Sequence, residues 1–223
     1  VPFGWRAVFV AVTVAAIIGL LLLATLFPET RPAEDRIKVS VGGVLDGFGQ
    51  LFRDWHFLGL TLIGGLGMAS FFSFLASSSF VYIGHYGLTP TQYSIAFAAN
   101  AIGFIGASQL AATLGARFGI PRVVLGAVAL HALFAVVLLI ATLLGADSLA
   151  ILIALLFLSF AFLGLVIPSS MILALENHGP IAGIASALGG TLQMVAGGIM
   201  IAVVSQIFDG TSRPMVAAIA LCA

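Results

Sequence analysis

Charged residues are scarce in this sequence. Of its 223 residues, eight are basic and eight acidic, or 7% of the chain, whereas 61% are hydrophobic. An average soluble domain has about 25% charged residues, and so few charged side chains do not cover the surface of a water-soluble protein of this length. The net charge of zero gives no indication of a nucleic-acid partner or of an acidic partner. The composition predicts an integral membrane protein.

Cysteine and catalytic motifs are also lacking. The single cysteine, Cys222, excludes a disulfide framework and a cysteine-ligated metal cluster. The four histidines are too scattered along the chain for a metal site. The sequence contains no G-x-S-x-G, no H-E-x-x-H and no G-x-x-x-x-G-K-[ST], and no close pair of acids at membrane depth. We therefore expect neither an enzyme nor a bound cofactor or metal.

The few charges leave long uncharged runs between them. A helix crosses the hydrocarbon core of a bilayer in about 20 apolar residues. The run from Trp55 to Ala116 is long enough for two such spans, with a turn of the sequence GHYGLTP at 84–90. The sequence predicts six full transmembrane helices and a truncated seventh that begins at Pro214. The six full spans are expected at 7–27, 57–82, 91–114, 123–145, 149–174 and 183–208.

Prolines and basic residues add boundaries and an orientation. Among the eight prolines, only Pro168 falls inside a predicted span, where it would interrupt the helix. Lysine and arginine gather in the cytoplasmic loops of membrane proteins. Arg6 and Arg213 lie on one side of the membrane, and six basic residues lie on the other, which makes the 28–54 loop cytoplasmic. These six are Arg31, Arg36, Lys38, Arg53, Arg117 and Arg122.

The two ends of the chain suggest a piece of a longer protein. The sequence starts at Val1 rather than at a methionine, and its last predicted helix stops halfway through a membrane. An incomplete helix leaves backbone and packing surfaces unpaired in lipid, which is unfavourable. We expect a fragment of a longer polytopic protein.

Short segments in a fixed order connect the sequence to a family. They are Gly4-Trp5-Arg6, Pro28-Glu29-Thr30, Phe57-Leu58-Gly59, the segment SSSFV at 77–81, YGLTP at 86–90, NAIG at 100–103, AGIASALGG at 182–190, and Gln193. In this order and spacing, they resemble helices six to twelve of the bicyclomycin-resistance (Bcr/CflA) drug exporters of the major facilitator superfamily. Ser79 departs from the family, which usually has proline there.

The resemblance implies a fold and a division of the chain. It implies an all-α, polytopic membrane protein of the bacterial inner membrane. Residues 1–27 would be the last helix of an N-terminal bundle, residues 28–56 a cytoplasmic interdomain loop, and residues 57–223 the C-terminal bundle of the superfamily. The loop is expected to be a solvated connection, with a short amphipathic helix near 44–52.

The resemblance also implies a function. Members of the family expel drug-like small molecules in exchange for protons, by alternating access of a site between two bundles. The residue that couples transport to protons would lie in the N-terminal half, which this chain lacks and which would be its partner. Two alternatives stay open: export of another small solute, such as a sugar or an amino acid, and a non-transporting membrane scaffold.

Five residues are predicted to bind the substrate. Phe71, Phe74 and Ser78 share one side of the 57–82 span, and such a face offers flat apolar area with a hydrogen-bonding group. Phenylalanine facing lipid is the alternative, but the resemblance places this helix at the central cavity. Asn100 and Gln193 are amides at membrane depth, which cost several kcal/mol unless they are hydrogen-bonded. Either a substrate or a neighbouring helix can provide that hydrogen bond.

Two further features are singled out. His131 is the only titratable side chain well inside a span. It has no carboxylate partner in the sequence, so we favour a neutral, hydrogen-bonded histidine over a proton relay. The superfamily has a loop motif that contains an acid and basic residues. A degenerate form of it is resembled by Arg117, Gly119 and Arg122, with Ala116 at the position of the acid. They are expected to act as a conformational latch, or to anchor the loop by contacting a helix C-terminus or anionic membrane lipid.

Overall fold

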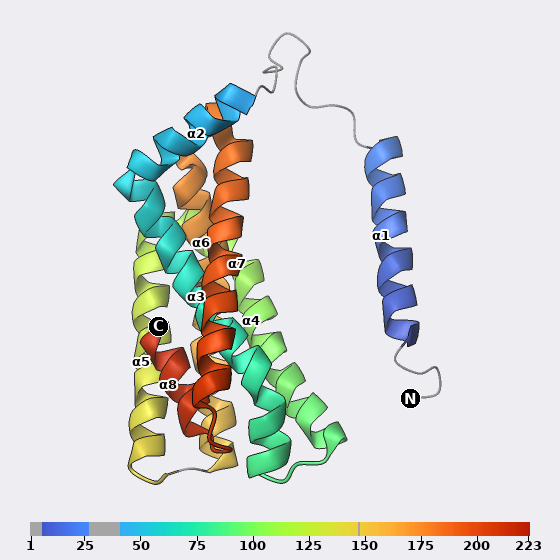
Figure 1. Cartoon of the computed structure of the whole chain (residues 1–223), viewed down its shortest axis with the longest axis vertical. Coiled ribbons are helices and arrows are strands. Elements are labelled where there is room, and N and C mark those ends of the chain that lie inside the picture. Colours follow the sequence, from blue (N-terminus) through green and yellow to red (C-terminus); the bar gives the residue numbers. More distant parts are fainter. Residues whose placement is uncertain (1–5, 27–40, 147) are drawn as a thin grey trace. The chain divides into compact units, whose positions relative to one another are not determined.

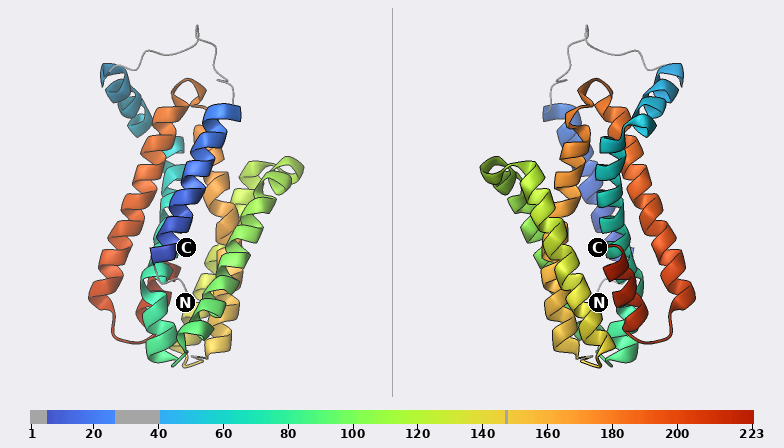
Figure 2. Two further views of the ribbon diagram at one scale, coloured as in Figure 1. Left: turned by 90° about the vertical axis from the view of Figure 1, so that its right-hand side faces the viewer. Right: turned by 90° about the vertical axis from the view of Figure 1, so that its left-hand side faces the viewer.

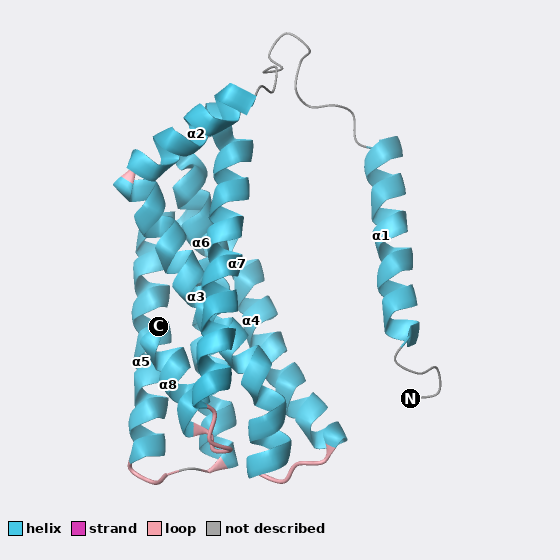
Figure 3. Ribbon diagram, in the orientation of Figure 1, coloured by secondary structure: helices cyan, strands magenta, loops and turns pink. Residues whose placement is uncertain are grey.

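The structure is a computed structural model that describes residues 6–26, 41–146 and 148–223. Among these residues, all regular secondary structure is helical (Figure 3). The chain divides into two units, 1–40 and 41–223, and each is described by itself.

The first unit contains a single described helix. This is α1, Arg6–Leu26, an apolar helix in which no side chain is buried. The segment 28–40 of the expected interdomain loop lies outside the described residues, as does Gly4-Trp5.

The second unit is a helical bundle (Figure 1). In chain order its elements are α2 (Val41–Arg53), α3 (Trp55–Ser79), the π-helical turn η2 (Phe80–His85), α4 (Pro90–Phe118), α5 (Ile120–Leu143), α6 (Leu149–Glu176), the 3₁₀ turn η3 (Gly179–Ile181), α7 (Ala182–Ile207) and α8 (Arg213–Leu221).

The predicted spans are confirmed. Within the described part of the chain, six helices are long and apolar enough to cross a membrane, and each coincides with a predicted span. The short helix α8 begins at the expected place. Two boundaries differ from the prediction: α3 and η2 together extend to His85, and α4 continues to Phe118.

Local sequence explains where these helices begin. Thr89 caps α4: its hydroxyl accepts the backbone N–H of Gln92, the Gln92 side chain accepts the N–H of Thr89, and Pro90 fills the first turn. Asp54 caps α3, and its carboxylate accepts the N–H groups of His56 at 2.8 Å and Phe57 at 3.2 Å. Each cap satisfies donors that the first helical turn leaves unpaired.

The helices form two layers. α7, α3, α6 and α4 pack side by side in that order, and α5 and α8 pack behind them against α6 and α3 (Figure 2). Glycines bring α4 and α6 close together: a Cβ on Gly164 would overlap the carbonyl of Phe104, and one on Gly103 would lie 2.8 Å from the ring of Phe157. The front layer therefore places residues of four spanning helices next to one another.

Candidate functional site

The predicted aromatic face of α3 is turned towards α4 and α6. The ring of Phe74 stacks on Phe97 of α4 at 5.6 Å and meets Phe160 of α6 edge-on at 5.0 Å. The ring of Phe71 stacks on Phe104 of α4 at 5.4 Å. Phe74 is 1% exposed and lies in the core of the bundle, whereas Phe71 is half-buried at its margin. Both residues help to hold the three helices together, and their contact with a substrate stays a prediction.

Ser78 and Asn100 lie near this cluster, around a tyrosine that the sequence analysis did not identify. The Tyr82 ring packs edge-on against Phe74 at 6.3 Å and lies 6.0 Å from the ring of Tyr93. The Tyr93 hydroxyl is hydrogen-bonded to Ser78 Oγ at 3.1 Å. The Asn100 side chain lies next to the Tyr82 hydroxyl, but their geometry falls short of a hydrogen bond. We call these five residues the tyrosine group.

Two polar atoms of the tyrosine group are buried without a partner among the described residues. They are the hydroxyl of Tyr82 and Oδ1 of Asn100, whose Nδ2 donates to the carbonyl of Ala96 one turn earlier. The sequence did not single out Tyr82 as a candidate binding residue, because tyrosine at the end of a span usually marks the membrane interface. Its position one turn after Ser78, on the same face, was the available signal.

Gln193 lies elsewhere, where α7 contacts α3 and α6. A Cβ on Gly64 would overlap Nε2 of Gln193 and would lie 3.1 Å from Oγ of Ser170. Nε2 of Gln193 and Oγ1 of Thr61 are buried without a partner in the described residues. We call Thr61, Gly64, Ser170 and Gln193 the glutamine group. Ser170 follows Pro168 and donates to the carbonyl of Ile167, so it stabilises backbone near the proline.

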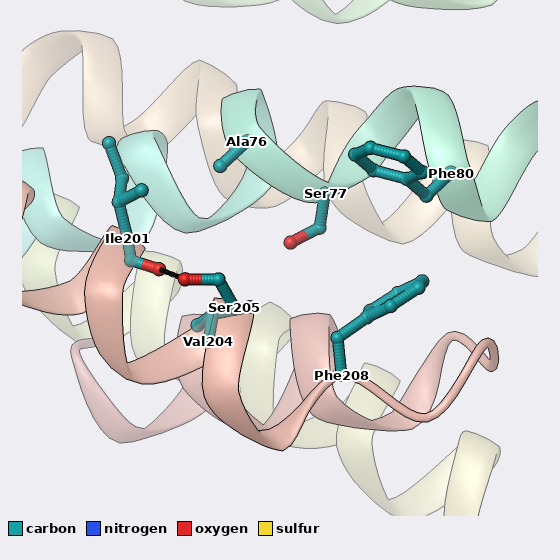
Figure 4. Close-up of a pocket in the computed structure, with 7 residues that line it drawn as sticks. All are labelled: Ala76, Ser77, Phe80, Ile201, Val204, Ser205 and Phe208. Carbon is teal, nitrogen blue, oxygen red and sulfur yellow. Dashed lines mark hydrogen bonds between the residues drawn. The ribbon is translucent and has the colours of Figure 1, made fainter.

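A pocket opens between the later parts of α3 and α7 (Figure 4). Its volume is about 240 Å³. The rings of Phe80 and Phe208 lie 5.7 Å apart at one end, and the buried Ser77 points its hydroxyl into the space (Figure 4). Ser205 also lines it, but its hydroxyl donates to the carbonyl of Ile201 at 2.7 Å. The sequence did not reveal this pocket, because its lining comes from two distant segments.

His131 is buried and hydrogen-bonded, as the sequence analysis favours. Its Nδ1 lies 2.8 Å from Oγ and 3.0 Å from the carbonyl oxygen of Ser159 on α6. Nε2 of the ring has no partner among the described residues. The histidine thus joins α5 of the rear layer to α6 of the front layer, apart from the two polar groups above.

The loop motif contains only one residue outside a helix. Gly119 is the whole connection between α4 and α5, with φ at 87°, a conformation that favours glycine. Arg117 lies in the last turn of α4, over the ring of Phe118 at 5.3 Å, where a positive charge suits the helix dipole. Arg122 lies in the first turn of α5, where the dipole does not favour it. The expected contact with a helix C-terminus therefore suits Arg117 alone.

A bundle built from helices that are long and apolar enough to cross a membrane defines the class of polytopic membrane proteins. The sequence matches the Major Facilitator Superfamily over residues 1–219, and the chain belongs to that superfamily. It is a multi-pass protein of the cell membrane, the inner membrane in bacteria that have two.

Two relatives agree with this assignment. The chain is 31% identical over 215 residues to "Uncharacterized MFS-type transporter YdgK" of Bacillus subtilis, a match covering 96% of this chain and 53% of the relative. It is 26% identical over 223 residues to "Bicyclomycin resistance protein homolog" of Haemophilus influenzae, covering 99% of this chain and 55% of the relative. The second name agrees with the resemblance found in the sequence. The chain spans about half the length of these curated relatives.

Proposed function

We propose that this chain forms the C-terminal half of a proton-coupled exporter of small drug-like molecules, which works by alternating access. Residues 57–223 are the C-terminal bundle, residues 1–27 the last helix of the N-terminal bundle, and residues 28–56 the cytoplasmic connection. Membership of the superfamily and the relative named for bicyclomycin resistance support this proposal.

One observation carries the proposal: buried polar atoms without partners lie within the spanning helices, and those of the tyrosine group lie beside aromatic rings. An unpaired buried donor or acceptor costs about 1–3 kcal/mol. The tyrosine group and the glutamine group hold four such atoms between them. A structural scaffold gains nothing from this cost. In a transporter, the helices separate during alternating access, and water or a substrate that enters between them can then provide the missing hydrogen bonds.

The two groups divide the proposed binding residues. Phe74, Ser78 and Asn100 belong to the tyrosine group, Phe71 lies beside it, and Gln193 belongs to the glutamine group. Aromatic rings with a few hydrogen-bonding groups suit a flat, mostly apolar molecule. This chemistry favours a drug-like substrate over a sugar, which requires many hydrogen bonds.

We place the residue that couples transport to protons in the other half of the transporter. No Asp, Glu, Lys or Arg lies in the interior of a span of this sequence. A carboxyl group suits coupling because its protonated form is far cheaper to bury than its charged form. The resemblance places the coupling acid of this family in the first helices of the N-terminal half. Arg117, Gly119 and Arg122 would then favour one conformation at the cytoplasmic side without carrying protons themselves.

The test uses the full-length transporter that carries this chain, produced in a bacterial host lacking its own exporters. Asn100→Ala and Gln193→Ala each remove an amide of one polar group, and we expect lower resistance to bicyclomycin, chloramphenicol or a sulfonamide. Gln109→Ala and Thr191→Ala are matched controls, because both side chains are exposed on the same two helices. Protein levels in the membrane are measured for each variant.

The outcomes separate the proposal from its alternatives. Lower resistance in the two amide variants, with both controls unchanged, supports drug export through these groups. Unchanged resistance to all three compounds at normal protein levels contradicts the assignment of the site. A full-length protein that confers no resistance but takes up or releases a labelled sugar or amino acid contradicts drug export itself.

A further inference from the structure

The helix α2 has two apolar faces, and only one of them is packed against the bundle. On the packed face, Gly47 and Leu51 are buried, and a Cβ on Gly47 would lie 2.9 Å from Ile184 of α7. Through this face, α2 packs against α7 and α3. It leaves the second apolar face without a partner in the described unit.

The second face is a stripe of three large side chains, which we call the outer stripe. Val41 is 80% exposed, Leu45 63% and Phe52 53%. At about 100° per residue, these three positions fall within a narrow arc of the helix. Apolar side chains so exposed on a single short helix indicate a surface that is not in contact with water.

The polar side chains of α2 lie roughly opposite the outer stripe. Asp46, Gln50 and Arg53 are all exposed and share an arc centred about 130° away from it. α2 therefore has one face for the bundle, one apolar face and one polar face. Such a division is typical of a helix that lies in a membrane interface, with its polar face in water.

The position of α2 places the outer stripe at the boundary of the membrane. Asp54 is the only residue between α2 and the spanning helix α3. Figure 1 shows α2 lying across the end of the bundle, at the start of α3 and of α7. The first residue of α3 is Trp55, 84% exposed, and tryptophan is enriched at this depth of the bilayer.

We propose that the outer stripe of α2 inserts into the boundary between headgroups and acyl chains of the cytoplasmic leaflet. The partner is a lipid surface, and the polar arc with Asp46 and Arg53 faces the cytoplasm. Exposed apolar side chains continue along α3 from Trp55 to Leu62 and Leu66. The connection between the two bundles is then held on the membrane at its second end, and is not freely solvated there.

Single tryptophans measure this directly. Trp5 and Trp55 are both replaced by phenylalanine, and Leu45→Trp or Gln50→Trp is added to the full chain in vesicles of phosphatidylcholine and phosphatidylglycerol. Brominated lipid with bromine near the headgroup quenches tryptophan in the interface, and iodide quenches tryptophan in water. We expect the Leu45→Trp variant to lose emission to the brominated lipid and the Gln50→Trp variant to lose emission to iodide.

A second pair, Phe52→Trp and Asp46→Trp, repeats the comparison at the other end of α2. Agreement between the pairs guards against a single variant that disturbs the helix. Quenching of the Leu45→Trp and Phe52→Trp variants by iodide would show that the stripe lies in water, and would overturn the proposal. Shielding of both from iodide and from brominated lipid would overturn it as well, because the stripe would then be covered by protein.

Discussion

Two helix contacts in the same bundle are built differently. Where α4 meets α6, Gly164 lies against the backbone carbonyl of Phe104, so main chain touches main chain. Where α3 meets α7, Gly64 and Gly197 lie against the side chains of Gln193 and Phe72. The first contact has no freedom to adjust, whereas the second depends on side chains that can rotate.

The two sides also differ in whether a side-chain hydrogen bond joins their helices, although each side holds a polar atom without a partner in the described residues, Nε2 of His131 on one and Nε2 of Gln193 on the other. In the rear contact of α5 with α6, Nδ1 of His131 is hydrogen-bonded to Ser159. On the α3 side, Gln193 and Thr61 hold polar atoms without partners, and a pocket opens nearby. Packed interfaces resist deformation, so we expect a Cβ added at the backbone contact of α4 with α6 to cost more stability than one added at the side-chain contact of α3 with α7.

Gly164→Ala should cause the largest loss of stability. Its Cβ would overlap a backbone carbonyl, so α4 and α6 must separate, and overpacking of this kind costs about 1–3 kcal/mol or more. The measurement is the melting temperature of the chain in detergent, followed by size-exclusion chromatography. Gly106→Ala on α4 is the control, because a Cβ there meets nothing within 4 Å. Equal melting temperatures for the two variants would contradict a rigid contact between α4 and α6.

Gly197→Ala should destabilise the chain by less, about 1 kcal/mol. The new Cβ meets the ring of Phe72, which can rotate away. Gly198→Ala, one residue further along α7 with nothing within 4 Å of its Cβ, is the matched control. The same melting experiment applies, and Phe72→Leu should restore the stability of the Gly197→Ala variant. Failure of this rescue would mean that the contact of α3 with α7 is as rigid as that of α4 with α6.

Gln193→Leu should leave stability unchanged or raise it by up to about 1 kcal/mol, because it removes a buried amide nitrogen without a partner. Ser159→Ala should lower stability by about 1 kcal/mol, because it removes a satisfied hydrogen bond to His131. Both are measured as the free energy of unfolding in denaturant. A loss of stability in the Gln193→Leu variant would indicate a structural role for this amide and would weaken its assignment to the substrate.

The smallest effect concerns the cytoplasmic end of α3. The backbone N–H of Phe57, followed by that of His56, lowers the pKa of the Asp54 carboxyl below its usual 3.8, and His178 contributes at 3.0 Å. A lowered pKa in the folded state adds stability that is present above the unfolded pKa, and this stability is lost as pH falls through the folded pKa.

The melting temperature of the chain should therefore fall more steeply below about pH 4 than that of an Asp54→Asn variant. Asparagine still caps a helix, so the two proteins should differ little in the charge-independent part of the cap. Asp46→Asn on the neighbouring helix is the control. Parallel melting curves for the chain and its Asp54→Asn variant between pH 3 and 7 would contradict a contribution from this pair.

The sequence predicts the helices far better than the contacts between them. The span boundaries follow from the length of apolar runs and from residues such as Pro90 and Thr89, whose effect on the chain is local. The short helix of the connection was expected near 44–52 and occupies 41–53. These features depend on a single segment and its surroundings in water or lipid.

The candidate site depends on contacts between segments, and the sequence predicts it only in part. Phe74, Ser78 and Asn100 come together, but Gln193 lies in a separate group. Tyr82 was missed because it stands at the end of the predicted span, where tyrosine usually marks the membrane interface. Similarly, no local pattern reveals that Gly164 touches backbone, since this depends on how α4 crosses α6.

The connection between α4 and α5, one residue long, bears on how the protein is made. Because Gly119 is the only residue between the two helices, we expect the two spans to enter the membrane together as a helical hairpin. Arg117 and Arg122 are the only charged groups near the bend, and the positive-inside bias predicts that they stay on the side from which the ribosome delivers the chain. We therefore expect the two arginines to set the direction of insertion for a pair of spans, before the bundle exists.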